Sequence, residues 1–175
     1  MATELELSAY HEAGHAVIAI MFSQRVLKMS IAENIAVSAI HYGYSNKFIA
    51  NVFEYSLYKH QNKAIRKLDS IFLDALIMIM IAGNIAENHY SNPVSTIVEL
   101  SDSGMAEDDM QRIKNIFEYA KDYNIVHKYQ DINGYTCMVF ITLVSSDNWS
   151  KVEKLANTLI EKKYLDEQEI QQIIG

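Results

Sequence analysis

Two histidines and a glutamate near the N-terminus have the types and the spacing of a metal site. Residues 11–15 read His-Glu-Ala-Gly-His, which matches the pattern H-E-x-x-H. On an α-helix, residues i and i+4 lie one turn apart on the same face, so His11 and His15 can both reach one Zn²⁺. Glu12 projects beside that pair, where it can meet a water at the metal. The pattern therefore indicates a zinc site with Glu12 as catalytic base, an arrangement suited to peptide hydrolysis.

The residues around this motif favour a helix. Apolar residues flank it, and either Thr3 or Ser8 could cap its start. Gly14 costs about 1 kcal/mol relative to alanine inside a helix, but a small residue lets another backbone or a ligand approach closely. Because so short a pattern also arises by chance, the motif alone leaves a metal site and a fortuitous match as alternatives.

A third metal ligand must come from elsewhere in the chain. Catalytic zinc is held by three protein ligands and keeps a fourth position for water. The candidates are the carboxylates and one imidazole of the middle of the chain: Glu87, Glu99, Asp102, Glu107, Asp108, Asp109 and His89. Their spacing does not choose among them.

Composition indicates one ordinary globular domain spanning residues 1–175. Half of the residues are hydrophobic and 21% are charged. The net charge of −7 argues against a nucleic-acid partner, which would need a basic face. The single cysteine, Cys137, excludes an intramolecular disulfide and is typical of a reducing compartment.

The sequence favours a cytoplasmic protein with no membrane partner. The N-terminus carries Glu4 and Glu6 rather than the basic residues that open a secretory signal. The most apolar stretch, residues 71–82, is interrupted by Asp74 and is too short to span a bilayer. We expect it to form a buried core helix.

Hydrophobic periodicity predicts a mainly α fold, a single helical domain with a small β-hairpin near the motif-bearing helix. Helices are expected over residues 4–23, 63–88, 106–121, 149–163 and 167–174. Short strands are expected over 25–31 and 36–42, joined by a turn at 32–34, and the chain should break at 91–93 and 102–104. Residues 48–58 are ambiguous. Within the unassigned region 123–148, helix and strand compete over 135–144.

Four segments resemble one known family. Residues 8–17, Ser-Ala-Tyr-His-Glu-Ala-Gly-His-Ala-Val, resemble the A-Y-H-E-A-G-H-A signature in the peptidase domain of the FtsH-type AAA proteases. Residues 81–87 resemble that family's L-G-G-R-A-A-E segment and depart from it at Asn84 and Ile85. Residues 103–110 resemble T-G-A-x-x-D-L with one extra residue after the glycine, and residues 159–170 resemble L-L-E-K-E-T-L-x-x-x-E-I. The segments follow the family's order and span nearly the whole chain.

The resemblance implies roles for further residues. The family's third zinc ligand corresponds to Asp109, with Asp108 as the alternative because the extra residue blurs the alignment. Glu87 would then hold a histidine in place instead of binding the metal. The expected strand 36–42, in particular Ala39, Ile40 and His41, would bind an extended peptide by edge pairing, although an ordinary edge strand fits the same pattern.

We therefore expect a zinc-dependent metalloendopeptidase that acts on peptides or unfolded proteins. One alternative is a catalytically inactive, metal-binding relative that serves as a regulator or protein-binding module, and another is hydrolysis of a non-peptide amide. The chain has no G-x-x-x-x-G-K-[ST] loop, so it resembles a free-standing peptidase domain without the family's ATPase module. A separate ATPase partner and a homo-oligomer remain open.

Overall fold

The computed structural model describes residues 2–32, 35–41, 46–58, 68–93 and 106–175. Its helices are α1 (Glu4–Met21), α2 (Asn46–Phe53), α3 (Tyr55–Tyr58), α4 (Ser70–Ser91), α6 (Glu107–Asp122), α7 (Ile132–Leu143), α8 (Ser146–Lys162) and α9 (Glu167–Ile174). Its strands are β1 (Arg25–Ala32), β2 (Ile35–His41) and β3 (Tyr164–Asp166). The expected mainly α fold with a few short strands is confirmed.

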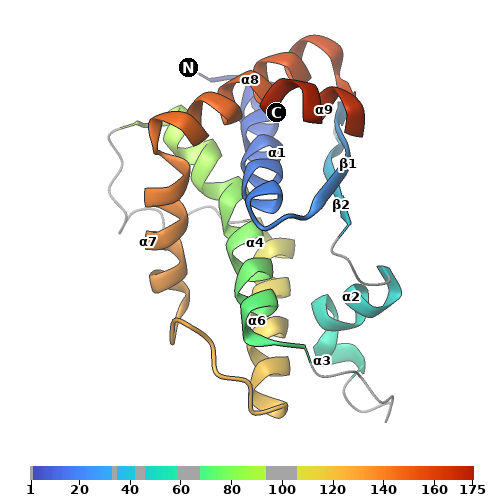
Figure 1. The fold of residues 1–175 in the computed structure, drawn as a ribbon, viewed down its shortest axis with the longest axis vertical. Coiled ribbons are helices and arrows are strands. Elements are labelled where there is room, and N and C mark those ends of the chain that lie inside the picture. Colours follow the sequence, from blue (N-terminus) through green and yellow to red (C-terminus); the bar gives the residue numbers. More distant parts are fainter. Residues whose placement is uncertain (1, 33–34, 42–45, 59–67, 94–105) are drawn as a thin grey trace.

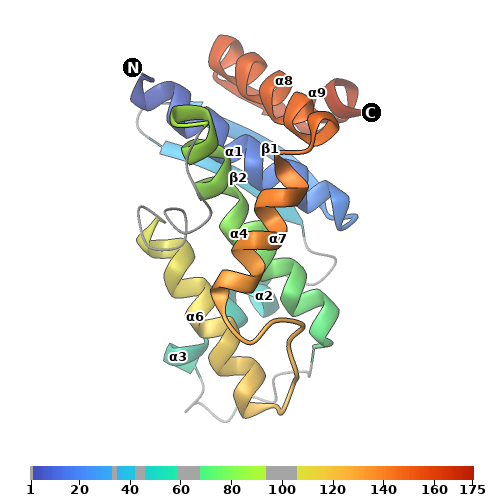
Figure 2. The ribbon, with the colours of Figure 1, turned by 90° about the vertical axis from the view of Figure 1, so that its left-hand side faces the viewer.

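Helices α1 and α4 form the centre of the molecule. They pack on each other more extensively than any other pair of elements, while α6 and α7 pack on α4 and α8 packs on α1. Figure 1 shows α7 on one side of this central pair, the hairpin with α2 and α3 on the other, and α8 and α9 across one end. The turned view in Figure 2 shows the same end covered by α8 and α9. The motif-bearing helix is thus enclosed along most of its length.

Gly14 allows the close approach of α1 and α4. A Cβ atom added there would lie 2.4 Å from the carbonyl oxygen of Ala82 and 2.7 Å from the Cβ of Ala86. Both distances are well inside van der Waals contact, so only glycine fits between the two helices. A small residue at position 14 was expected to let another backbone approach closely. The backbone that approaches it is that of α4.

Helix α4 differs at both ends from the prediction of a helix over 63–88. It begins at Ser70, because the Asp69 side chain accepts a hydrogen bond from the Phe72 amide and caps the helix. Residues 63–67 lie outside the described part of the chain. At its other end the helix continues to Ser91, the first residue of the expected break at 91–93.

Helix α4 is also longer than the apolar stretch in the sequence suggested. The helix has 22 residues, and its most apolar 18-residue window has a mean hydropathy of 1.7, so it could cross a membrane by length and composition alone. Within the protein, however, 67% of its most apolar window is buried. This is the burial expected of a core helix.

The predicted hairpin is confirmed, and its sheet gains one strand that the sequence did not indicate. Strands β1 and β2 pair antiparallel within one residue of the expected bounds, apart from residue 42, which lies outside the described residues. Strand β3 pairs with the other side of β1, with Met29 opposite Leu165, so the order is β2-β1-β3. In this sheet β2 is therefore an edge strand.

The ambiguous segments resolve as helices. In the segment 135–144, where strand and helix competed, all residues up to Leu143 belong to α7, whose start is capped by the Asp131 side chain accepting from the Gly134 amide. Residues 48–58 form parts of α2 and α3. Helices α6, α8 and α9 lie within a few residues of their predicted bounds, and the expected break at 102–104 lies outside the described residues.

Candidate metal centre

The start of α1 is fixed by a reciprocal cap. The Glu6 amide donates to Thr3 Oγ1 at 3.3 Å, and the Thr3 amide donates to Glu6 Oε2 at 2.7 Å. Thr3, one of the two expected capping residues, is therefore the one that caps the helix. The cap sets the helix in register two turns before the motif. Because they are four residues apart on this helix, His11 and His15 lie on one face, with their Nε2 atoms 2.9 Å apart.

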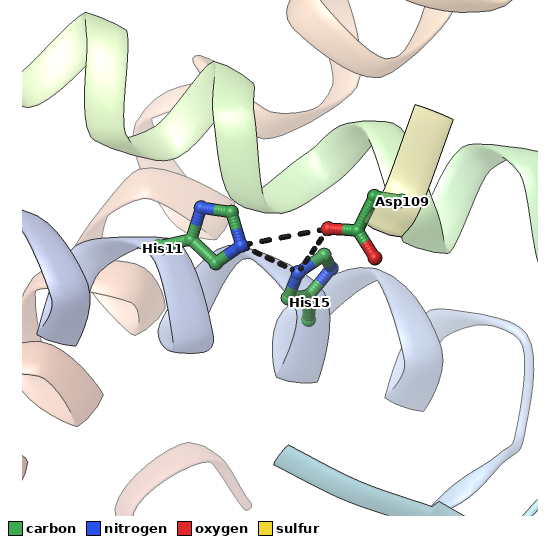
Figure 3. A group of neighbouring side chains, drawn as sticks. All are labelled: His11, His15 and Asp109. Atoms are coloured by element: carbon green, nitrogen blue, oxygen red, sulfur yellow. Dashed lines mark hydrogen bonds and ion pairs between the residues drawn. The ribbon is translucent and has the colours of Figure 1, made fainter. Parts of the chain in front are cut away.

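Asp109 completes a group of three ligand atoms. It lies in the first turn of α6, and its Oδ2 atom is 3.6 Å from His11 Nε2 and 3.5 Å from His15 Nε2. All three ligand atoms lie within 4.8 Å of one another. Figure 3 shows the aspartate reaching across to the histidine pair. Two imidazole nitrogens and one carboxylate oxygen form the donor set of a catalytic zinc site, so these residues fit that metal.

Among the described residues, no other candidate ligand belongs to this group of ligand atoms. Asp108 and Glu107 are exposed, whereas only 5% of Asp109 is exposed. His89 packs edge-on against Trp149, with ring centroids 4.5 Å apart. Glu99 and Asp102 are outside the described residues. Asp109 is therefore the carboxylate that the fold brings to the Nε2 atoms of both histidines.

Helix α4 orients both imidazole rings. Glu87 Oε2 lies 3.1 Å from His11 Nδ1, and the Ile79 carbonyl oxygen lies 2.6 Å from His15 Nδ1. Each acceptor favours a proton on Nδ1 and leaves the lone pair of Nε2 for a metal. Glu87 thus occupies the orienting position that the resemblance implied.

Glu12 lies in the same cavity as the ligand group. The cavity has a volume of about 240 Å³ and is lined by His11, Glu12, His15 and Asp109, with part of β2 opposite. Only 5% of Glu12 is exposed. Ser38 Oγ donates to the Glu12 carbonyl oxygen at 3.2 Å and holds β2 against α1 at this point. A buried carboxylate beside the ligands can accept a proton from a water in the cavity.

Contacts among the candidate ligands shift the pKa values of His11 and Asp109. Burial alone would lower the pKa of His11, but the neighbouring carboxylates of Asp109 and Glu87 outweigh it and raise that pKa to about 9. Burial alone would raise the pKa of Asp109, but His11 and His15 hold it well below its usual range. Asp109 is therefore ionised at neutral pH, as a metal-binding carboxylate must be.

Two residues at the site had no role in the sequence analysis. A Cβ atom at Gly83 would lie 2.5 Å from His15 Nε2 and 2.7 Å from His11 Nε2, so α4 leaves room for the ligands only because this residue is glycine. A glycine inside an apolar helical stretch was the available signal. Arg112, one turn after Asp109 on α6, donates to Asp109 Oδ1 at 3.1 Å and leaves Oδ2 facing the histidines. No sequence pattern indicated it.

The residues expected to bind a peptide are only partly at the cavity. Ile40 lines it, but Ala39 and His41 do not, and the remaining contacts from β2 come from Ala36, Val37 and Ser38. The first half of the strand therefore contributes more of the cavity lining than the predicted residues do. A peptide-binding role for the strand stays a prediction.

Comparison of the sequence with protein-family models and with curated proteins finds no match. The resemblance to the FtsH-type peptidases thus rests on the four sequence segments themselves.

Proposed function

We propose that this protein is a zinc-dependent metalloendopeptidase that hydrolyses peptide bonds in peptides or unfolded proteins. The observation that supports this most strongly is the convergence of His11, His15 and Asp109, from two helices, with the Glu12 carboxylate in the same cavity. The donor set is that of a catalytic zinc ion, and a site that only stabilises a fold has no use for a base beside it.

The residues of the site would have separate roles in metal binding, ring orientation and proton transfer. His11, His15 and Asp109 would hold the metal, while Glu87 and the Ile79 carbonyl keep the rings turned toward it. Zn²⁺ bound there would act as a Lewis acid toward the peptide carbonyl and lower the pKa of a coordinated water. Glu12 accepts the proton of the attacking water and then delivers it to the leaving amine.

The proposal is tested by separating metal binding from hydrolysis. Elemental analysis of the purified protein should give close to one zinc per chain. Wild-type protein should cleave casein, and Glu12→Gln should retain zinc and lose cleavage, because the amide cannot accept the proton. Glu107→Gln is the matched control, since Glu107 is an exposed carboxylate on α6 outside the cavity.

The same experiment distinguishes the alternatives. Stoichiometric zinc without cleavage of casein or of a broad peptide library would favour a non-catalytic metal-binding module. Absence of zinc after reconstitution would refute the metal site itself.

A further inference from the structure

A second cavity adjoins the metal centre. It has a volume of about 370 Å³ and lies between α6 and the α2–α3 segment, which pack side by side below the hairpin in Figure 1. Asp108 and Arg112 line both this cavity and the one that holds the ligand group. A substrate bound at the metal centre would therefore have this second space next to it.

The wall of the second cavity is fixed by hydrogen bonds to α6. Asn115, which is buried, donates from its side-chain amide to the carbonyl oxygen of Phe53 at 2.5 Å. Tyr55 Oη donates to Asp122 Oδ2 at 3.1 Å. These bonds attach the end of α2 and the start of α3 to α6. The cavity is thus held by the same helix that carries Asp109.

The described lining residues combine an apolar surface with two carboxylates. Phe53 and Leu57 supply the apolar part, and 69% of Leu57 is exposed. Glu54 and Asp108 are both exposed, and neither carboxylate forms an ion pair with another residue in the described ranges.

Arg112 is the one cation among the residues that line this cavity in the described part of the chain, and it is already engaged. Its guanidinium donates to Asp109 and lies 5.7 Å from the centre of the Phe53 ring. Its charge is therefore directed to the ligand Asp109 and to the ring. Among the described lining residues the two carboxylates therefore outnumber the single cation.

We infer that this cavity is a specificity subsite that receives a lysine or arginine side chain of the substrate next to the scissile bond. Long basic side chains lay an aliphatic stem along apolar surface and keep the charged head in a polar setting. Here Phe53 and Leu57 contact the stem, and Glu54 and Asp108 receive the head. The inference rests on the proposed peptidase function, which supplies the scissile bond.

Binding of small probes tests the subsite without relying on catalysis. The protein is zinc-loaded Glu12→Gln, and the probes are the Nα-acetyl methylamides of lysine, norleucine and glutamate, titrated by NMR at low salt. The lysine probe should bind roughly fivefold more tightly than the norleucine probe, because exposed ion pairs are individually weak and are screened by salt. Its shifts should centre on the amides of Leu57 and Asp108.

Removing the charges of Glu54 and Asp108 provides the matched comparison for probe binding. In Glu54→Gln/Asp108→Asn the preference for lysine over norleucine should fall to about one, while Glu107→Gln should retain it. Equal or absent binding of the three probes, a preference for the glutamate probe, or a lysine preference that survives the double substitution would overturn the inference.

Cleavage specificity separates this inference from the proposed function. Mass spectrometry of casein fragments from wild-type protein should show Lys or Arg enriched at one fixed position beside the cut, and the double variant should lose that enrichment. Lysine-selective binding without any cleavage would refute the peptidase function and leave a binding site for basic side chains. Cleavage with no basic preference at any position would refute the subsite and leave the peptidase function standing.

Discussion

Asp108 and Asp109 are adjacent in the first turn of α6, but only Asp109 turns its carboxylate toward the histidine pair. Asp109→Asn should lower zinc affinity by more than about a hundredfold, since loss of a partner behind a ligand alone costs about ten- to a hundredfold. Competition with a chromophoric chelator measures the change. Asp108→Asn should leave zinc affinity within a few-fold of wild type, and the reverse ranking would assign the third ligand to Asp108.

Gly83 makes room for the Nε2 atoms of His11 and His15. In Gly83→Ala the added methyl would lie within 2.7 Å of both Nε2 atoms, so the rings must move away from each other or from Asp109. Helix α4 itself should tolerate alanine, which is about 1 kcal/mol more favourable than glycine in a helix. We expect a native-like circular dichroism spectrum together with strongly reduced zinc binding. Unchanged zinc affinity would show that the rings do not need this space.

Spacing along the sequence predicts the residues of the candidate site that share one helix, but it does not predict those whose position depends on tertiary packing. His11, Glu12 and His15 follow from helical periodicity, because spacing alone places them together. Asp109 could be proposed only through the family resemblance, since its position depends on how α6 packs on α4. Arg112 acts through Asp109, so it could not be recognised before Asp109 had been placed.

At the scale of elements, the contact between α1 and α4 controls the site. Gly14→Ala would place a methyl group 2.4 Å from the Ala82 carbonyl oxygen and push the helices apart. Overpacking of this kind costs about 1–3 kcal/mol, which exceeds the gain of about 1 kcal/mol from alanine's helix propensity. We expect a lower free energy of unfolding in urea, together with weaker zinc binding. A variant as stable as wild type would show that the two helices can separate without loss.

The contact between α4 and α8 should make stability sensitive to acid. His89 packs against Trp149, its Nδ1 atom has no hydrogen-bond partner among the described residues, and burial lowers its pKa below 6.5. The unfolded chain then binds more protons than the folded protein as the pH falls below that value, so folding stability decreases with falling pH. His89→Phe should remove this component. Melting temperatures of both proteins at pH 7.5 and pH 5.5 measure it, and an equal loss in both would exclude His89 as its source.

The predictability of each element depended on whether its pattern was local. The hairpin was recovered because alternation and turn chemistry fix it within a short stretch. Residues 135–144 were ambiguous because apolar and β-branched residues suit a buried strand or a buried helix, and the cap at Asp131 together with packing on α4 selects the helix. Strand β3 was not predicted, because a segment of three residues is too short to show a periodic pattern. It exists through its pairing with β1, which is a long-range contact.

In the whole molecule, the candidate metal centre joins parts of the chain that are distant in sequence. Helix α1 carries two of the candidate ligands and the proposed base, α6 carries the third candidate ligand, and α4 lies behind the rings and orients them. Such a site exists only when these helices are packed together. Metal binding and folding should therefore be thermodynamically linked.

Zinc should consequently stabilise the whole fold. A ligand that binds only the folded state adds about 2.7 kcal/mol at a free concentration of 100 times its Kd. For a chain of this length that corresponds to a rise in Tm of roughly 5–10 °C. Scanning calorimetry with and without zinc measures the rise, chelation with EDTA should reverse it, and Mg²⁺ should not reproduce it because Mg²⁺ prefers an all-oxygen octahedral site. Asp109→Asn should show little of the zinc-dependent rise. An equal rise in that variant would place the stabilising zinc elsewhere on the protein and break the proposed link between α1 and α6.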